Sequence, residues 1–248
     1  MNGIRPKHWI GLAVLAVCSV ALSAKPQSGA EATTKPMAGD PGPSATLGAK
    51  PSQADDKTAI LFDGLSWRGW QRKDGPESQW VIQDDGSVQA AGVDAVTNST
   101  FGDFQLHVEF YCPKMSGKQG QARSNSGVYL HGRYEIQVLD SFGDPPTGNG
   151  CGALYSIAAP MVNASRPPGT WQTYDIIFRA PRFDDQDKIT ELPRLTVLHN
   201  GIVIHNNLEL PSTTPGGLDR TMVDVGPILL QFHGDPVRYR NIWLRTLD

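Results

Sequence analysis

One short stretch of the chain combines residue types that do acid–base chemistry with a spacing that places them together. Polar and apolar side chains alternate over residues 133–138, and the polar ones are Arg133, Glu135 and Gln137. This alternation predicts a β-strand with one buried face and one face bearing a guanidinium, a carboxylate and an amide. Asp140 follows Gln137 by three residues, one more than strand alternation allows for two side chains on the same face. This indicates a β-bulge that re-aims Asp140 onto the face of Glu135. Such a row suits the floor of a sugar site.

Four residues are candidates for catalysis: Glu135, His233, Arg133 and Asp140. Glu135 is either a general base or a surface carboxylate paired with Arg133. Asp140 either joins it or caps the turn that follows, and His233 is a base, a ligand or a structural histidine. Arg133 would stabilise a developing negative charge. Glu135, Asp140 and His233 together are a hypothetical site for a divalent cation, although no local spacing demands one.

A second group is expected to contact a sugar through hydrogen bonds or stacking, and it comprises Arg123, Asn125, Gln137, Trp171 and Gln231. Arg123 and Asn125 stand on a loop, where turn chemistry is the alternative explanation for the asparagine. Trp171 and Tyr174 have opposite strand parity, so that one packs in the core while the other faces a ligand. Tyr174 shares its parity with apolar neighbours and is the better core residue. Arg240 and Asn241 either bind ligand or close the sheet.

The elements that must position these side chains are short β-strands. They are expected at residues 79–83, 87–90, 104–110, 133–138, 171–179, 195–199, 202–205, 227–233 and 239–247. Asn200-Gly201 and Asp84-Asp85-Gly86 are typical hairpin turns, whereas His131-Gly132 is either a turn or part of a strand. With no convincing amphipathic helix, the pattern predicts an all-β fold, an antiparallel two-sheet jelly-roll sandwich.

Composition divides the chain into three parts. Residues 1–24 have a basic start, a short apolar run and small residues at their end, which predicts a signal peptide and export to the periplasm or beyond the cell. A lipid anchor on Cys18 is the alternative form of export. Residues 25–57 are rich in proline and small residues and predict a disordered linker. Residues 58–248 form the expected domain, and no later segment of the chain is expected to cross a membrane.

Charge and cysteine content restrict the partners. Loss of Arg5 and Lys7 with the signal peptide removes two positive charges and takes the net charge from -3 to -5. This mild acidity argues against nucleic acid as a partner. Cys112 and Cys151 then remain, either as a disulfide or as two separate buried thiols.

Several strings in the expected domain resemble the 3-keto-disaccharide hydrolase family. They lie at residues 61–64, 125–130, 132–140, 163–175 and 241–245, in the family's order. The resemblance implies a concanavalin-like jelly roll of the lectin and glucanase type. It also implies a secreted enzyme that acts on glycosides already oxidised at sugar carbon 3.

The chemistry implied by this resemblance begins at carbon 2, because a ketone at C3 acidifies the C2 proton. A general base removes that proton, the enolate expels the C1 substituent, and water adds to the product. Two carboxylates flanking an oxocarbenium centre are not required, and Gln137 stands where jelly-roll glucanases carry their central aspartate. A noncatalytic carbohydrate-binding module on the same fold is the main alternative. An ordinary glycosidase acting on unoxidised glycosides is the third.

Overall fold

The structure is a computed structural model that describes residues 55–247. The expected signal peptide and residues 25–54 of the expected linker lie outside the described residues, so export and a Cys18 anchor remain predictions. Within the described part of the chain, no helix has the length and apolar character needed to span a bilayer.

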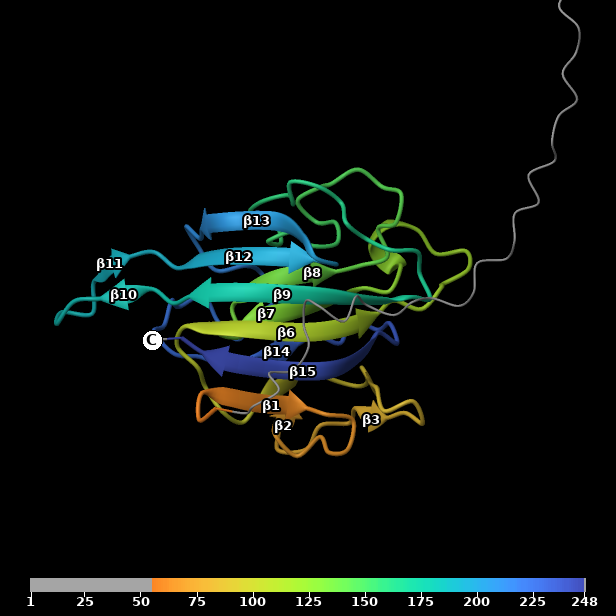
Figure 1. Ribbon diagram of the computed structural model, residues 1–248, viewed down its shortest axis with the longest axis horizontal. Helices are drawn as coiled ribbons and strands as arrows, with labels where there is room; N and C mark the ends of the chain where they lie inside the picture. The colour runs from red at the N-terminus through yellow and green to blue at the C-terminus, as the bar shows by residue number, and fades with distance from the viewer. Residues whose placement is uncertain (1–54, 248) are drawn as a thin grey trace, which may run out of the picture. The chain divides into compact units, whose positions relative to one another are not determined.

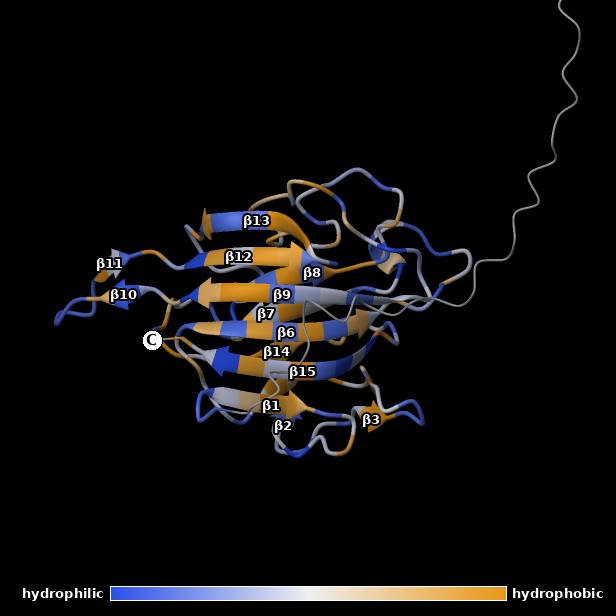
Figure 2. Ribbon diagram, in the orientation of Figure 1, coloured by the Kyte–Doolittle hydropathy of each residue, from blue (hydrophilic) through white to orange (hydrophobic). Residues whose placement is uncertain are grey.

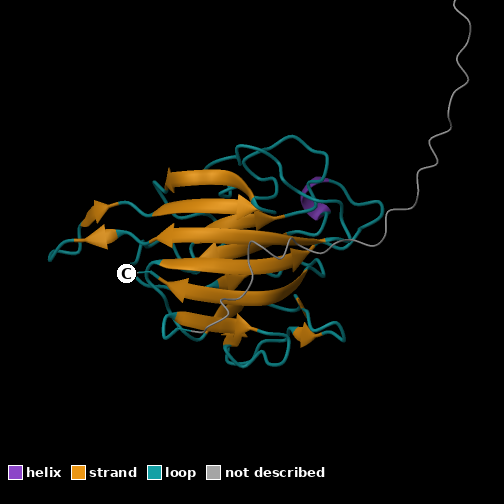
Figure 3. Cartoon of the chain, in the orientation of Figure 1, coloured by secondary structure: helices purple, strands orange, loops and turns teal. Residues whose placement is uncertain are grey.

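Antiparallel β-sheets build the fold (Figure 1). The eight-stranded sheet runs in the order β13 (Ile202–Glu209), β12 (Arg194–His199), β9 (Trp171–Arg179), β6 (Phe104–Tyr111), β15 (Arg238–Thr246), β4 (Val88–Gln89) and β3 (Val81–Ile82), with β1 (Thr58–Phe62) also paired to β15. The five-stranded sheet runs in the order β2 (Trp70–Arg72), β5 (Ala95–Thr97), β14 (Leu229–Leu230), β7 (Ser126–Leu130) and β8 (Tyr134–Val138). A separate hairpin joins β10 (Arg182–Phe183) to β11 (Ile189–Glu191). The helical content of residues 55–247 is one 3-10 turn, Gly120–Ala122 (Figure 3).

Strand alternation creates the core between the two sheets. Every second residue of β6, beginning at Phe104, is fully buried, and the same parity of β9 buries Tyr174 and Phe178. From the opposite sheet, Tyr134 meets Phe178 with ring centroids 5.7 Å apart. Figure 2 shows the apolar segments of these strands interrupted by hydrophilic positions, as expected for a sheet with one buried face. The expected all-β sandwich is confirmed.

Most expected strands are present, and the ambiguous turn is resolved. Strand β9 coincides with the predicted 171–179, and Asn200-Gly201 joins β12 to β13 with both residues at positive φ. His131 and Gly132 also have positive φ, 52° and 66°, so they form the turn between β7 and β8. The expected strand over 227–233 is only Leu229–Leu230. The N–H of Gln231 still donates to the Gly127 carbonyl of β7, but the N–H of Phe232 donates to the Asp94 carboxylate and the chain departs from the sheet. That departure places two candidate side chains in the site described below.

Cys112 and Cys151 are free thiols in the core, with exposures of 0% and 2%. The Cys151 sulfur lies 3.1 Å from the Tyr174 hydroxyl, while the Cys112 sulfur approaches the Ser124 carbonyl at 4.0 Å. Of the two alternatives, the structure therefore has two separate buried thiols.

Candidate functional site

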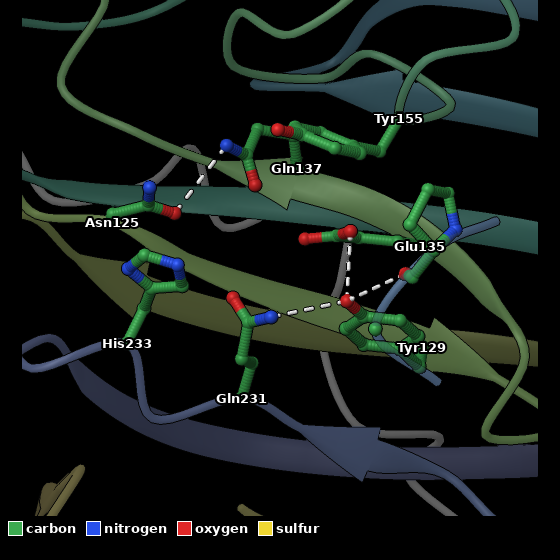
Figure 4. A pocket seen from close by; sticks show the side chains of 9 residues that line it. Asn125, Tyr129, Glu135, Gln137, Tyr155, Gln231 and His233 are labelled. Atoms are coloured by element: carbon green, nitrogen blue, oxygen red, sulfur yellow. Dashed lines mark hydrogen bonds between the residues drawn. The ribbon is translucent and has the colours of Figure 1, made fainter. Parts of the chain in front are cut away.

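A cavity of about 190 Å³ opens on the face of the five-stranded sheet that points away from the core. Its lining is rich in amides and phenols, with a single carboxylate, and comprises Asn125, Tyr129, Glu135, Gln137, Tyr155, Pro215, Gly216, Gln231 and His233 (Figure 4). Drug-sized ligands use pockets of roughly 300–1,000 Å³. The cavity is smaller than that, which suits one sugar ring better than an oligosaccharide.

The register of three neighbouring strands brings these residues together. In the β7–β8 pair, Tyr129 lies opposite Glu135, and Gly127 lies opposite Gln137. Strand β14 pairs with β7 on its other side, with Leu229 opposite Tyr129. The chain that continues from β14 therefore runs past Tyr129 and carries Gln231 and His233 into the cavity. Figure 4 shows these two on one side of the Tyr129 hydroxyl and Glu135 on the other.

Glu135 is a buried carboxyl group whose Oε2 accepts a strong hydrogen bond. It is 3% exposed, and the Tyr129 hydroxyl donates to its Oε2 at 2.8 Å. Burial raises the pKa of Glu135 from 4.5 to about 8; the Tyr129 hydrogen bond opposes this rise and the negative charge of Asp94 adds to it. Burial likewise raises the pKa of the Tyr129 phenol, so Tyr129 keeps its proton. A carboxyl group that titrates near neutral pH suits proton transfer to and from a substrate.

Two glycines make room for this pair. A Cβ atom at Gly127 would lie 2.4 Å from Glu135 Oε1, and one at Gly216 would lie 2.6 Å from the Tyr129 hydroxyl. Gly216 also has a φ of 81°, a conformation that other residues adopt only at a cost. Both functional groups therefore occupy space that any larger residue at these positions would fill.

Side-chain amides surround the carboxyl group. Gln231 Nε2 donates to the Tyr129 hydroxyl at 3.0 Å. The amide of Gln137 reaches Gln121 Oε1 at 3.1 Å and Asn125 Oδ1 at 3.4 Å. In the alternative amide orientation, which improves its pairing, Gln137 donates to Glu135 Oε1 at 3.0 Å and to the Ser126 carbonyl at 2.7 Å. We adopt that orientation because the Glu135 and Ser126 oxygens are acceptors.

A charged pair behind the cavity connects two of its walls. The Lys73 ammonium group donates to the Gly216 carbonyl at 2.8 Å and lies 3.4 Å from Asp94. Asp94 accepts from the backbone N–H of Phe232 at 2.9 Å, between the two lining residues of that segment. Lys73 and Asp94 thereby connect the Gly216 wall to the segment after β14.

The structure gathers Glu135, Gln137, Asn125, Gln231 and His233 in one cavity, but two other catalytic candidates lie outside it. Arg133 ends the hairpin turn, where its guanidinium binds Asp219 and the His131 carbonyl rather than Glu135. The ion pair between Arg133 and Glu135, which was the alternative interpretation of both residues, is therefore not formed. Asp140 lies beyond the end of β8, and its carboxylate accepts from the backbone N–H of Phe142 at 3.4 Å. It caps the following turn, which was the alternative reading.

Two of the sugar-binding candidates also lie elsewhere. Arg123 forms an ion pair with Asp144 and does not line the cavity. Trp171 lies on the outer face of the eight-stranded sheet, where the Arg240 guanidinium stacks 4.0 Å from its ring centroid. Arg240 and Asn241 both bind Glu109, at 2.6 and 2.9 Å, so they close the sheet. Strand parity predicts the face of its own strand on which a side chain lies. It does not predict which of the two sheets contains that strand.

The hypothetical cation site of Glu135, Asp140 and His233 does not come together. Among residues 55–247, no group of three histidine, cysteine, aspartate or glutamate side chains is arranged as metal ligands. Glu135 and His233 line the cavity, whereas Asp140 faces its turn. The hypothetical three-ligand set is therefore not assembled: the β7–β8 register shows no bulge up to Val138, and Asp140 does not line the cavity.

Four lining residues were not among the candidates: Tyr129, Tyr155, Pro215 and Gly216. Tyr129 was ambiguous in sequence because its facing depended on the His131-Gly132 turn. Tyr155 lies on a loop whose backbone pairs with the free edge of β8, through a 3.1 Å bond from its N–H to the Glu135 carbonyl. No local sequence pattern predicts that Pro215 and Gly216 line the cavity, because only the tertiary fold brings them there.

The sequence of this chain matches a known protein family. Residues 57–245 match the family of the 3-keto-alpha-glucoside-1,2-lyase-like domain. The chain belongs to this family. A comparison with curated proteins returns no match.

Solved structures share the family's architecture. A "putative glycosyl hydrolase" from Parabacteroides distasonis is 36% identical, with a TM-score of 0.71 over 77% of this chain and 84% of that chain. A second protein of that designation from the same organism is 20% identical, with a TM-score of 0.59 over 77% of this chain and 94% of that one. The first supports a glycosyl hydrolase-like domain, while the second shows the shared fold.

Proposed function

We propose that the domain cleaves 3-keto-glycosides by removing the C2 proton, eliminating the C1 substituent and hydrating the product. The observation that carries this proposal is the state of Glu135. It is the one carboxyl group among the described cavity residues, 3% exposed, with a pKa raised to about 8. A lone carboxyl group tuned toward neutral pH matches a general base for an acidified C–H bond.

An ordinary glycosidase needs a second carboxyl group at a defined separation, roughly 5–5.5 Å for retaining and 6.5–9.5 Å for inverting enzymes. The nearby Asp94 is committed to Lys73 and the Phe232 N–H, and Asp140 to its turn. Neither lines the cavity. The arrangement therefore favours chemistry that begins with proton abstraction over direct attack at the anomeric carbon.

The remaining lining groups are assigned by their chemistry. Asn125, Gln137 and Gln231 present amides that donate to and accept from sugar hydroxyls. The exposed imidazole of His233, at the cavity mouth, is the candidate donor to the C3 carbonyl as it becomes an enolate oxygen. Arg133 does not take this role, because Asp219 binds its guanidinium outside the cavity.

Incubation in deuterated water tests this function. Purified wild-type and Glu135→Gln proteins are mixed with 3-keto-glucosides and with the parent glucosides, with and without a chelator. We expect deuterium at C2 and cleavage in the keto series with the wild type only. Glu135→Gln should bind the keto sugar without turnover. A binding module would bind both series with no turnover, cleavage of the parent glucosides would indicate an ordinary glycosidase, and loss on chelation would reveal a required metal.

A further inference from the structure

The Tyr129 hydroxyl has more hydrogen-bonding partners than one proton can serve. It lies 2.8 Å from Glu135 Oε2 and 3.2 Å from the Pro215 carbonyl, and it accepts from Gln231 Nε2 at 3.0 Å. A phenol has one proton to donate and can accept two hydrogen bonds. The position of the phenol proton must therefore depend on whether Glu135 is ionised.

Two arrangements of the phenol and carboxyl protons fit these distances. When Glu135 is ionised, the phenol proton points to the carboxylate. When Glu135 is protonated, its O–H donates to the phenol oxygen, and the phenol proton turns to the Pro215 carbonyl at 3.2 Å. Tyr129 is fully buried, and the absence of a side chain at Gly216 keeps its hydroxyl at the cavity wall. The two groups that would exchange the proton thus lie opposite each other in the β7–β8 pair.

From this geometry we infer that Tyr129 is a second catalytic residue, which relays the proton taken by Glu135 to the oxygen that leaves C1. The inference rests on the proposed function. It assigns the acid that the elimination needs without a further ionisable group, because a substrate oxygen in the cavity would take the place of the Pro215 carbonyl as acceptor of the phenol proton.

The relay balances in atoms and charge. Glu135 takes the C2 proton, and the electron pair of that bond forms the C2–C3 double bond of the enolate. The enolate then restores the C3 carbonyl, forms a C1–C2 double bond and breaks the C1–O bond, whose electron pair stays on the leaving oxygen. That oxygen takes the phenol proton while Tyr129 takes the proton from Glu135. One proton has moved from C2 to the alcohol, and Glu135 is again a carboxylate.

Hydration uses the same relay in reverse. Water adds its oxygen to C1, its proton passes to Tyr129, and the phenol proton returns through Glu135 to C2. The same residues serve both halves of the reaction, as expected when two steps share one geometry.

Tyr129→Phe tests the relay through its dependence on the leaving group. An alkoxide needs a proton to leave, whereas a nitrophenolate does not. Because positioned proton transfer is worth about 10²- to 10⁴-fold, we expect kcat/KM for methyl 3-keto-glucoside to fall by about 100-fold or more. For 4-nitrophenyl 3-keto-glucoside we expect a loss of less than about tenfold, since C2 deprotonation by Glu135 is intact. Deuterium exchange at C2 should persist in the variant.

Tyr155→Phe is the matched control, because it removes a phenol from the same cavity. It should lower kcat/KM for the methyl and the nitrophenyl substrates by the same factor. Equal losses for the methyl and nitrophenyl substrates in Tyr129→Phe would overturn the relay, while a wild type without C2 exchange would overturn the proposed function instead. If Tyr129→Phe does not fold, a fluorinated tyrosine at 129 alone retains the phenol and lowers its pKa. The relay then requires a changed ratio of the methyl to the nitrophenyl rate, and an unchanged ratio refutes it.

Discussion

Removing the Glu135 charge should change how the stability of the domain depends on pH. The pKa of Glu135 is raised from 4.5 to about 8 in the folded protein, chiefly by burial. Below the pKa of the unfolded state, both the folded and the unfolded protein hold the Glu135 proton, so Glu135 imposes no penalty on folding. As pH rises through this window, the unfolded chain releases the proton while the folded one retains it, so folding is penalised.

The size of the effect follows from the shift. Each pKa unit corresponds to about 1.4 kcal/mol, so a rise from 4.5 to about 8 costs the wild type about 5 kcal/mol once both states are ionised. Because the side chain is 3% exposed, little of this is screened by water. Glu135→Gln keeps the shape and removes the titration. The difference in the free energy of unfolding between Glu135→Gln and the wild type should therefore grow in favour of the variant from about pH 4.5 and level off above about pH 8.

Urea unfolding from about pH 4 to pH 9 measures this difference, since groups common to both proteins cancel. Glu77→Gln, at an exposed glutamate, is the matched control and should give a curve parallel to that of the wild type. If the free energies of Glu135→Gln and wild type stay parallel over the whole range, Glu135 is not held in a desolvated site. The proposed role as a tuned base would then lose its physical basis.

Three further predictions concern activity and acid stability. The pH dependence of kcat/KM should show an ascending limb with a midpoint at about pH 8, since the ionised form of Glu135 is the base, and a flat profile up to pH 9 would contradict this assignment. Gly127→Ala should lower turnover by about 100-fold with an unchanged circular dichroism spectrum, because its Cβ would lie 2.4 Å from Glu135 Oε1; near-normal turnover would show that the carboxyl position is not critical. Burial opposes ionisation of Glu109, but hydrogen bonds from His107, Asn241 and Arg240 outweigh it and lower its pKa to about 2. The contribution of ionised Glu109 to stability is complete above the unfolded pKa of 4.5 and should fade as pH falls toward 2. Urea unfolding should therefore show that Glu109→Gln costs about 3 kcal/mol at neutral pH and much less near pH 2. A pH-independent cost would refute the ion-pair explanation.

The cavity owes its properties to a polar face that is buried without belonging to the core. Leu229, Val96 and Tyr129 form a small apolar cluster of their own on the outer side of the five-stranded sheet, with Leu218 packed against them. This cluster and the covering loops remove water from Glu135. Part of the desolvation that tunes the base thus comes from Leu229, Val96 and Leu218, which have no role in the proposed chemistry.

Strand parity was readable from the chain alone, because side-chain direction in a strand depends only on position along it. It predicted that Glu135 and Gln137 share a face, that Tyr174 packs in the core, and that the fold is an all-β sandwich, all of which the structure contains. Local turn chemistry also predicted the hairpin at Asn200-Gly201. Both central positions of such a turn have positive φ, which asparagine and glycine adopt more readily than other residues.

Which residues meet across the sheet was decided only by the tertiary structure. Tyr129 and Gln231 are far apart in sequence and lie together because β14 pairs with β7, a non-local arrangement that no short pattern encodes. Arg133, two residues from Glu135, is turned away because the hairpin turn ends there and Asp219 is available to it. Alternation assigns faces residue by residue, whereas a site depends on the order of strands and the path of loops, which long-range packing sets.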